Sequence, residues 1–301
     1  MEYALILNGE NITEKLKVKE LFVSDASGAK ADRIKMQIIN TRDIDITHGQ
    51  RLTAKFGGYT SGNMTVDEFV CGTATSRVGA ISSPKGAKKP KTRHYMKVRL
   101  FDIVNDVATE TGLSVYYIGI TNHFYENVTR FEETPLAFLN RVCVREGYSL
   151  KIDDGRIVLF DKTRSENAAT VLTVTPTDII DNRILFSENP NLVSSVTVQY
   201  YDSENQIVIS HTAHSGYEGE DKIITEYLSS IAEAERFSQG YVRELNKNAV
   251  TVSGFIHINT DIAATNNIEC NGFGRFDGKY FIEEITHDPI NELTKFTARK
   301  L

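Results

Sequence analysis

Alternation of apolar and polar side chains over the first 80 residues predicts a series of short β-strands. The segment 32–40 alternates more cleanly than its neighbour 15–25 and places Ile34, Met36 and Ile38 on one face. The segment 15–25 alternates as well, except that its parity slips near Leu21. Further strands are expected over 51–60 and 64–78. Short strands at this spacing are typical of a small barrel or sandwich.

A helical period replaces the alternation in the middle of the chain. Apolar residues of the segment 100–112 recur at i, i+3, i+4, i+7 and i+8, and Gly112 stands where a C-terminal cap belongs. A second helix is expected to begin after Thr134, because threonine is a good N-cap and Pro135 suits the first helical position. Gly147 is expected to end it.

The second predicted helix is amphipathic. Leu136, Leu139 and Cys143 fall on one stripe, which we expect to be buried. Arg141 and Arg145 fall outside this stripe and are expected to face solvent. Cys143 is therefore interpreted as a core residue, since it is not at a helix N-terminus, where a thiolate would be stabilised.

Three strands are expected around these helices. The run 113–120 is rich in β-branched and aromatic residues. The strands 148–152 and 156–160 are separated by Asp153, Asp154 and Gly155, and Asp-Gly supplies the positive φ that a tight hairpin needs. Together with the two helices, these strands predict a compact α/β module.

The C-terminal part returns to β-structure. Strands over 192–202 and 206–214 are expected to pair around the turn DSEN. The segment 221–247 is predicted to be one long helix. The remaining predicted strands are punctuated by Gly and Asn and cover 249–259, 267–274, 279–288 and 292–301.

These elements predict an α+β, mainly β fold with three parts. We expect an N-terminal β-barrel region over 1–97 and a central α/β module over 98–165. A C-terminal β-barrel region with one long helix is expected over 166–301. The segment 82–94 is rich in Pro, Gly and Lys and is predicted to be a loop or linker.

Composition excludes several classes of protein. The chain has 301 residues with a net charge of −6, which argues against a dedicated nucleic-acid binder. No run approaches the length needed to cross a bilayer, and the start lacks the pattern of a signal peptide. We therefore expect a protein made in the cytoplasm that acts without a membrane. The three cysteines are far apart, which favours buried thiols over disulfides or a zinc site.

No arrangement of residues predicts catalysis, a cofactor or a metal. Glu132 and Glu133 precede a helix N-terminus, where negative charge is favourable for structural reasons alone. The histidines of HTAH at 211–214 are three apart on an expected strand and point to opposite faces. The glycine-rich segment 272–278 lies between strands and opens no helix, so tight turns are the better interpretation than a phosphate loop.

The predicted linker carries a cluster of basic residues that includes Lys85, Lys88 and Lys89. Clustered lysines can contact nucleic-acid phosphates, but no aromatic side chains are interleaved to stack on bases. A flexible or inter-subunit role is the better interpretation.

Three stretches, taken together, match a known pattern. The first, 129–161, has an acidic pair, a helix with an FLxR core, then Gly-Tyr and a hairpin; the matching residues are Glu132, Glu133, Phe138, Leu139, Arg141, Gly147 and Tyr148. The second comprises ADRIKMQIIN with RLTAKFG, and VRLFDIVNDVATETGLSV downstream. The third is IECNGFGRFDGKYFIEEITHD near the C-terminus. In their order and spacing these stretches resemble the phage late control D proteins, the tail hubs of contractile phages.

The resemblance implies a non-catalytic structural protein of the baseplate. In that family a homotrimer, with two tube-like β-barrels in each chain, adapts the six-fold tail tube to the three-fold spike. Its partners would be the tail tube protein, the central spike protein and other baseplate proteins, with DNA only passing through the central channel. The protein would reside in a phage tail or a tail-like particle such as a bacteriocin, assembled in the cytoplasm of the bacterial host.

Two other functions remain open from the residues alone. A peptidoglycan-degrading enzyme of the tail would use Glu132 or Glu133 as its acid. A nucleic-acid or carbohydrate binding module would use the basic cluster. Under the hub hypothesis, the interface candidates are Glu132, Glu133, Arg141, Arg145, Lys85, Lys88 and Lys89.

Overall fold

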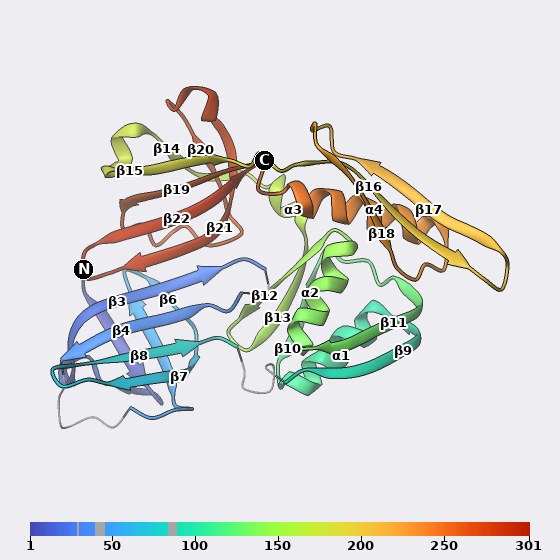
Figure 1. Ribbon diagram of the computed structural model, residues 1–301. Coiled ribbons are helices and arrows are strands. Elements are labelled where there is room, and N and C mark those ends of the chain that lie inside the picture. Colours follow the sequence, from blue (N-terminus) through green and yellow to red (C-terminus); the bar gives the residue numbers. More distant parts are fainter. Residues whose placement is uncertain (29, 40–45, 84–88) are drawn as a thin grey trace.

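The computed structural model describes residues 1–28, 30–39, 46–83 and 89–301. Figure 1 shows two β-rich halves side by side, a smaller part of helices and strands beside them, and a projecting sheet that carries one helix. The mainly β architecture with a small α/β module, predicted from the sequence, is confirmed.

The N-terminal half is one antiparallel sheet in the order β3-β4-β8-β7-β5-β1-β2. Its strands are β1 (Tyr3–Leu7), β2 (Glu10–Asn11), β3 (Lys17–Ala26), β4 (Arg33–Ile39), β5 (Arg51–Phe56), β6 (Tyr59–Thr60), β7 (Met64–Cys71) and β8 (Thr75–Ile81). The parity slip expected near Leu21 corresponds to a register shift between Val18 and Glu20, where the ladder to β4 is irregular. The single strand predicted over 64–78 is two strands, because the chain turns at Gly72.

The C-terminal half is antiparallel as well, except that β14 pairs in parallel with β20. Its strands are β14 (Thr170–Val174), β15 (Ile179–Glu188), β19 (Val250–His257), β20 (Asn267–Cys270), β21 (Gly278–Asp288) and β22 (Leu293–Lys300). The order β15-β19-β22-β21 continues through β21 directly into β3 of the N-terminal half. Among the described residues, no pairing closes either half into a ring, so the tube-like shape of the two barrels stays a prediction.

The central part has the helix–strand–helix–hairpin order that the sequence predicted, with two strands that it did not. Its elements are β9 (Lys91–Arg99), α1 (Leu100–Thr111), β10 (Ser114–Ile118), β11 (Phe124–Glu133), α2 (Pro135–Arg145), β12 (Tyr148–Asp153), β13 (Arg156–Asp161) and α3 (Lys162–Glu166). Thr134 caps α2 by accepting a hydrogen bond from the amide of Ala137, and Gly112 ends α1 in the left-handed conformation, as predicted. The hairpin turns through Asp154 and Gly155, both with positive φ.

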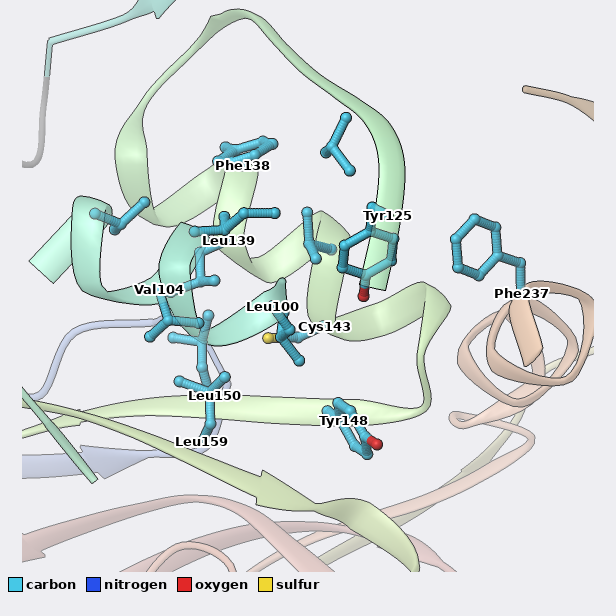
Figure 2. Close-up of a cluster of buried hydrophobic side chains, with 14 of the residues drawn as sticks. Leu100, Val104, Tyr125, Phe138, Leu139, Cys143, Tyr148, Leu150, Leu159 and Phe237 are labelled. Atoms are coloured by element: carbon cyan, nitrogen blue, oxygen red, sulfur yellow. The ribbon is translucent and has the colours of Figure 1, made fainter. Parts of the chain in front are cut away.

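The buried stripe of α2 is also confirmed. Leu139 and Cys143 are fully buried and face α1 and the strands β12 and β13 (Figure 2). Phe237, which comes from a helix about 100 residues further along the chain, reaches the edge of the same cluster (Figure 2). The core of the central part therefore extends beyond the segment that the sequence grouped together.

The projecting sheet supplies that helix. Its elements are β16 (Val193–Asp202), β17 (Ile207–His214), β18 (Glu220–Thr225) and α4 (Ile231–Asn246). The pairing of β16 with β17 is confirmed, but the prediction of one helix over 221–247 is wrong at its start. The β-branched residues of β18 pair in parallel with β16, and the helix begins only after Ser230, its N-cap. The predicted domain limits at residues 97 and 165 stay a prediction.

Candidate functional site

The acidic pair before α2 lies in two different environments. Arg141 donates from Nε and Nη2 to the two carboxylate oxygens of Glu133, at 3.0 and 2.8 Å, and from Nη2 to the carbonyl of Thr129 at 2.8 Å. The hydrogen bond to Glu133 raises the pKa of Arg141. Glu132 is exposed, with a φ of 49°, where β11 departs from regular pairing with β9. A carboxylate held by both oxygens in an arginine fork anchors α2 to β11.

Arg145 does not face solvent, and that prediction is wrong. Its side chain is 5% exposed, and its guanidinium carbon lies 5.2 Å from the ring centroid of Tyr125 and 4.4 Å from that of Phe237. Nη1 is 3.4 Å from a carboxylate oxygen of Glu226. The cause is α4, which covers this end of α2. Gly240 permits the close approach, because a Cβ there would come within 2.4 Å of the Arg145 carbonyl oxygen.

Glu146 forms a second buried connection at the same end of α2. The hydroxyl of Tyr125 and Nε of Arg236 each donate to it at 2.8 Å, and Nε2 of His123 lies 3.7 Å away. Burial lowers the pKa of His123 despite this carboxylate. The sequence offered no signal for this group, because its members are separated by up to 113 positions along the chain.

The basic segment is only in part a loop. Lys85 and Lys88 lie outside the described residues, and Lys89 is exposed. From Lys91 onward the chain is the strand β9, paired with β11, so the predicted linker ends earlier than residue 94.

The basic residues at the start of β9 are neutralised within the chain. Lys91 forms an ion pair with Glu110 at 3.0 Å, and Arg93 with Asp106 at 2.5 Å, both on α1. Arg130, whose side chain is fully buried, donates to Glu110 at 2.7 Å. Glu110 thus accepts from two cations, which lower its pKa against the opposing effect of burial. These contacts fasten the β9–β11 ribbon to α1.

The cysteine and histidine candidates show no sign of a catalytic or metal-binding role within the described part of the chain. Cys143 is completely buried, and burial raises the pKa of its thiol to about 12. Nδ1 of His211 lies 2.7 Å from the hydroxyl of Ser238 on α4, while His214 is exposed on the same strand. Within the described ranges, no group of three or more His, Cys, Asp or Glu side chains is placed to hold a metal ion. None of the helices there is both long and apolar enough to span a bilayer.

A buried charged group connects the central hairpin to both β-rich halves. Lys151 on β12 forms an ion pair with Asp25 on β3, and the other oxygen of Asp25 accepts from the amide of Ala264 at 2.9 Å. Asp32, 5% exposed, accepts from the amide of Ala26 at 3.0 Å. Burial, followed by the charge of Asp25, raises the pKa of Asp32 to about 7. We call Asp25, Asp32 and Lys151 the charged joint.

His287 lies beside this joint, between the two halves. It is fully buried on β21, and its ring centroid is 5.5 Å from that of Phe56 and 5.0 Å from that of Tyr59. Its Nδ1 is 3.0 Å from the hydroxyl of Thr294. Burial lowers the pKa of His287 to about 4. The interface between the halves is therefore closed by a neutral imidazole among aromatic rings.

This whole-length arrangement is the fold of phage and prophage tail proteins, which confirms at the level of fold the resemblance expected from the sequence. A tail protein of the prophage MuSo2 of Shewanella oneidensis matches with a TM-score of 0.78 and 14% identity, over 100% of this chain and 98% of that one. A tail protein of Neisseria meningitidis matches with a TM-score of 0.78 and 13% identity, over 100% and 97%. No protein-family model and no curated protein matches the sequence.

The likeness extends to secretion machines. A component of the type VI secretion system of E. coli, described as similar to the phage T4 tail proteins gp27 and gp5, matches with a TM-score of 0.63 and 11% identity. The match covers 99% of this chain and 76% of that one. Structural tail proteins and a secretion component thus share the fold of this chain.

Proposed function

We propose that this chain is a structural baseplate hub protein of the late control D type, in a contractile phage tail or tail-like particle. The observation that carries the proposal is the match to tail proteins over the full length of this chain and nearly the full length of theirs. The three sequence stretches that resemble late control D proteins lie in all three parts of that fold.

The two β-rich halves support a ring. They are joined edge to edge by pairing of β21 with β3, so the two halves of one chain form a single continuous sheet. Three chains would present six such halves in a closed ring, which suits contact with a six-fold tube on one side and a three-fold spike on the other. The tube protein, the spike protein and other baseplate proteins are the partners of this proposal.

We infer that the protein is not an enzyme. Glu133, one of the two acids that a peptidoglycan-degrading activity would use, is held by both oxygens by Arg141. Glu132 lies on an exposed bulge, and its carboxylate has no partner among the described residues. If the purified protein lyses cell walls and a Glu132→Gln, Glu133→Gln double variant does not, this inference is wrong.

Light scattering behind size exclusion tests the ring directly. The expected mass of the ring alone is about 101 kDa, three times the 33.7 kDa of one chain. If the ring forms only with the spike protein, the mass of the bound spike adds to this value. A chain that stays monomeric with both the spike and the tube proteins present would overturn the proposal. If the expected mass is found, negative-stain images of the assembly would distinguish a ring from other assemblies of the same mass.

A further inference from the structure

A cavity of about 520 Å³ opens where α3, β17, the end of α4 and the strands β21 and β22 meet. Unlike the surface of this acidic chain as a whole, its charged lining is mostly basic. We call it the cationic cavity, and its basic side chains are Lys162, Arg243, Lys247, Lys279, Arg299 and Lys300.

Four of these six cations have carboxylate partners within the chain. The ion pairs, all between 2.6 and 2.8 Å, join Arg243 and Arg299 to Glu166, Arg299 to Glu283, and Lys162 and Lys247 to Glu244. Three carboxylates therefore serve four cations. These pairs fix the wall of the cavity, because they tie α3 to α4 and to the last strand.

The remaining two cations lack a carboxylate. Nζ of Lys279 donates to the backbone carbonyls of Glu166 and Ala168 at 2.7 and 2.6 Å, at the end of α3. Lys300 pairs with Tyr280 across the two strands; its Nζ donates to the carbonyl of Arg275 at 3.2 Å and lies 5.9 Å from the ring centroid of Tyr280, so its ammonium points away from the cavity. Within the described part of the chain, neither ammonium has an ion-pair partner. Positive charge in excess at a concave surface raises the local concentration of anions.

We propose that the cationic cavity binds an acidic peptide segment of a partner protein, an inference that rests on the proposed role in an assembly. Carboxylates spaced along a peptide would pair with Lys279, which lacks an ion-pair partner, and with Arg243, whose side chain is 42% exposed in the cavity. Tyr217, 47% exposed on the rim, offers an aromatic face to the apolar parts of such a segment. The net charge of −6 disfavours a long polyanion such as nucleic acid, whose charge extends beyond the cavity.

A labelled glutamate-rich peptide is a direct probe of this site. Its affinity is measured by fluorescence anisotropy at about 20 mM salt, where ion pairs are weakly screened. The double variant Arg243→Gln, Lys279→Gln is expected to weaken binding about tenfold or more, since two charge-assisted contacts are lost. Lys295→Gln is the matched control: it removes an exposed lysine from the same strand, β22, outside the cavity, and should change the affinity less than about twofold.

Three results would overturn the proposal. One is a wild-type protein that does not bind the peptide. The second is an equal loss of affinity in the control and the double variant. The third is binding of inorganic phosphate or a short oligonucleotide that the peptide cannot displace, which would assign the cavity to phosphates instead.

Lys279 also holds the end of α3, so the double variant needs a check of its fold by thermal unfolding. If it does not fold, Arg243→Gln alone provides the test, with an expected loss of about threefold from one exposed ion pair. Peptide binding requires no ring, whereas the mass measurement requires no peptide. Failure of the cavity proposal and failure of the hub proposal are therefore distinguishable.

Discussion

The charged joint and the cationic cavity both contain unequal numbers of positive and negative groups, but the excess has opposite sign. In the joint, one ammonium pairs with Asp25 and a second carboxylate, Asp32, is buried nearby; both aspartates are 5% exposed. Around the cavity, four of six cations share three carboxylates, two have none, and the space beside them is open. The joint has an excess of negative charge, and the cavity has an excess of positive charge.

The two sites differ in what can balance their excess charge. A buried carboxylate without a cation is costly, so it takes up a proton instead, which the raised pKa of Asp32 reflects. An open cavity can keep its excess charge at little cost, because water and ions solvate it until a partner arrives. The joint is therefore expected to govern stability, and the cavity to govern binding.

The largest effect on stability is expected from Lys151→Met. It leaves two carboxylates buried at the joint without their cation, and breaking a buried pair in this way costs about 3–5 kcal/mol. Urea unfolding at neutral pH measures the loss. Lys35→Met, at an exposed position on β4, is the control and should stay within about 0.5 kcal/mol of wild type. A loss below that limit for Lys151→Met would refute the importance of the joint.

His287→Gln tests the neutral imidazole between the halves. Because burial lowers its pKa to about 4, the contribution of His287 to stability is complete above the unfolded value of 6.5 and is lost as the pH falls towards 4. Wild type should therefore lose up to about 3 kcal/mol relative to the variant across this window. Unfolding curves of both proteins, compared at each pH, give the difference. Parallel pH profiles would contradict it.

Asp32→Asn should act in the opposite direction. The folded pKa of about 7 lies above the unfolded value of 3.8, so the stability linked to Asp32 is complete below 3.8 and is lost as the pH rises through 7. Asparagine keeps an oxygen for the amide of Ala26 but carries no charge. The variant should be more stable than wild type by about 2 kcal/mol at pH 8 and similar to it at pH 4. A variant that is less stable at pH 8 would show that the negative charge is needed.

The smallest effect on stability is expected from Lys300→Gln, beside the cavity. Its ammonium has no carboxylate partner in the described part of the chain, so unfolding should change by less than about 0.5 kcal/mol. Peptide affinity should also change by less than about twofold, because this ammonium points away from the cavity. A loss of affinity as large as that of the double variant would contradict this placement of the side chain.

Local signals in the sequence predicted much of the fold. Thr134, Pro135 and the apolar stripe sufficed for α2, and the Asp-Gly turn sufficed for the hairpin behind it, because these devices act within a few residues. The prediction of a helix is wrong for residues 221–225, since Ile223 and Ile224 fit either a helical or a strand period and only the pairing with β16 decides.

The placement of charged side chains could not be predicted in the same way. The sequence predicts Arg145 in solvent, yet the structure buries it. Its ion-pair partner Glu226 is 81 positions away, and the helix that covers Arg145 is α4, which follows Glu226. Asp25 and Lys151 are separated by 126 positions. Apolar stripes carry a local period, whereas the partner of a charge depends on how distant elements pack.

The pairing of β21 with β3 also has a consequence for biosynthesis. Ser24 and Thr286, which share a hydrogen bond at 2.9 Å across this pair, are 262 positions apart. While the ribosome is still producing the middle of the chain, β3 has its partner on one side only, and an unpaired strand edge invites wrong partners. Any surface that depends on both halves therefore forms only late, when β21 has emerged. Contacts that need such a surface can form only after synthesis of the chain is nearly complete.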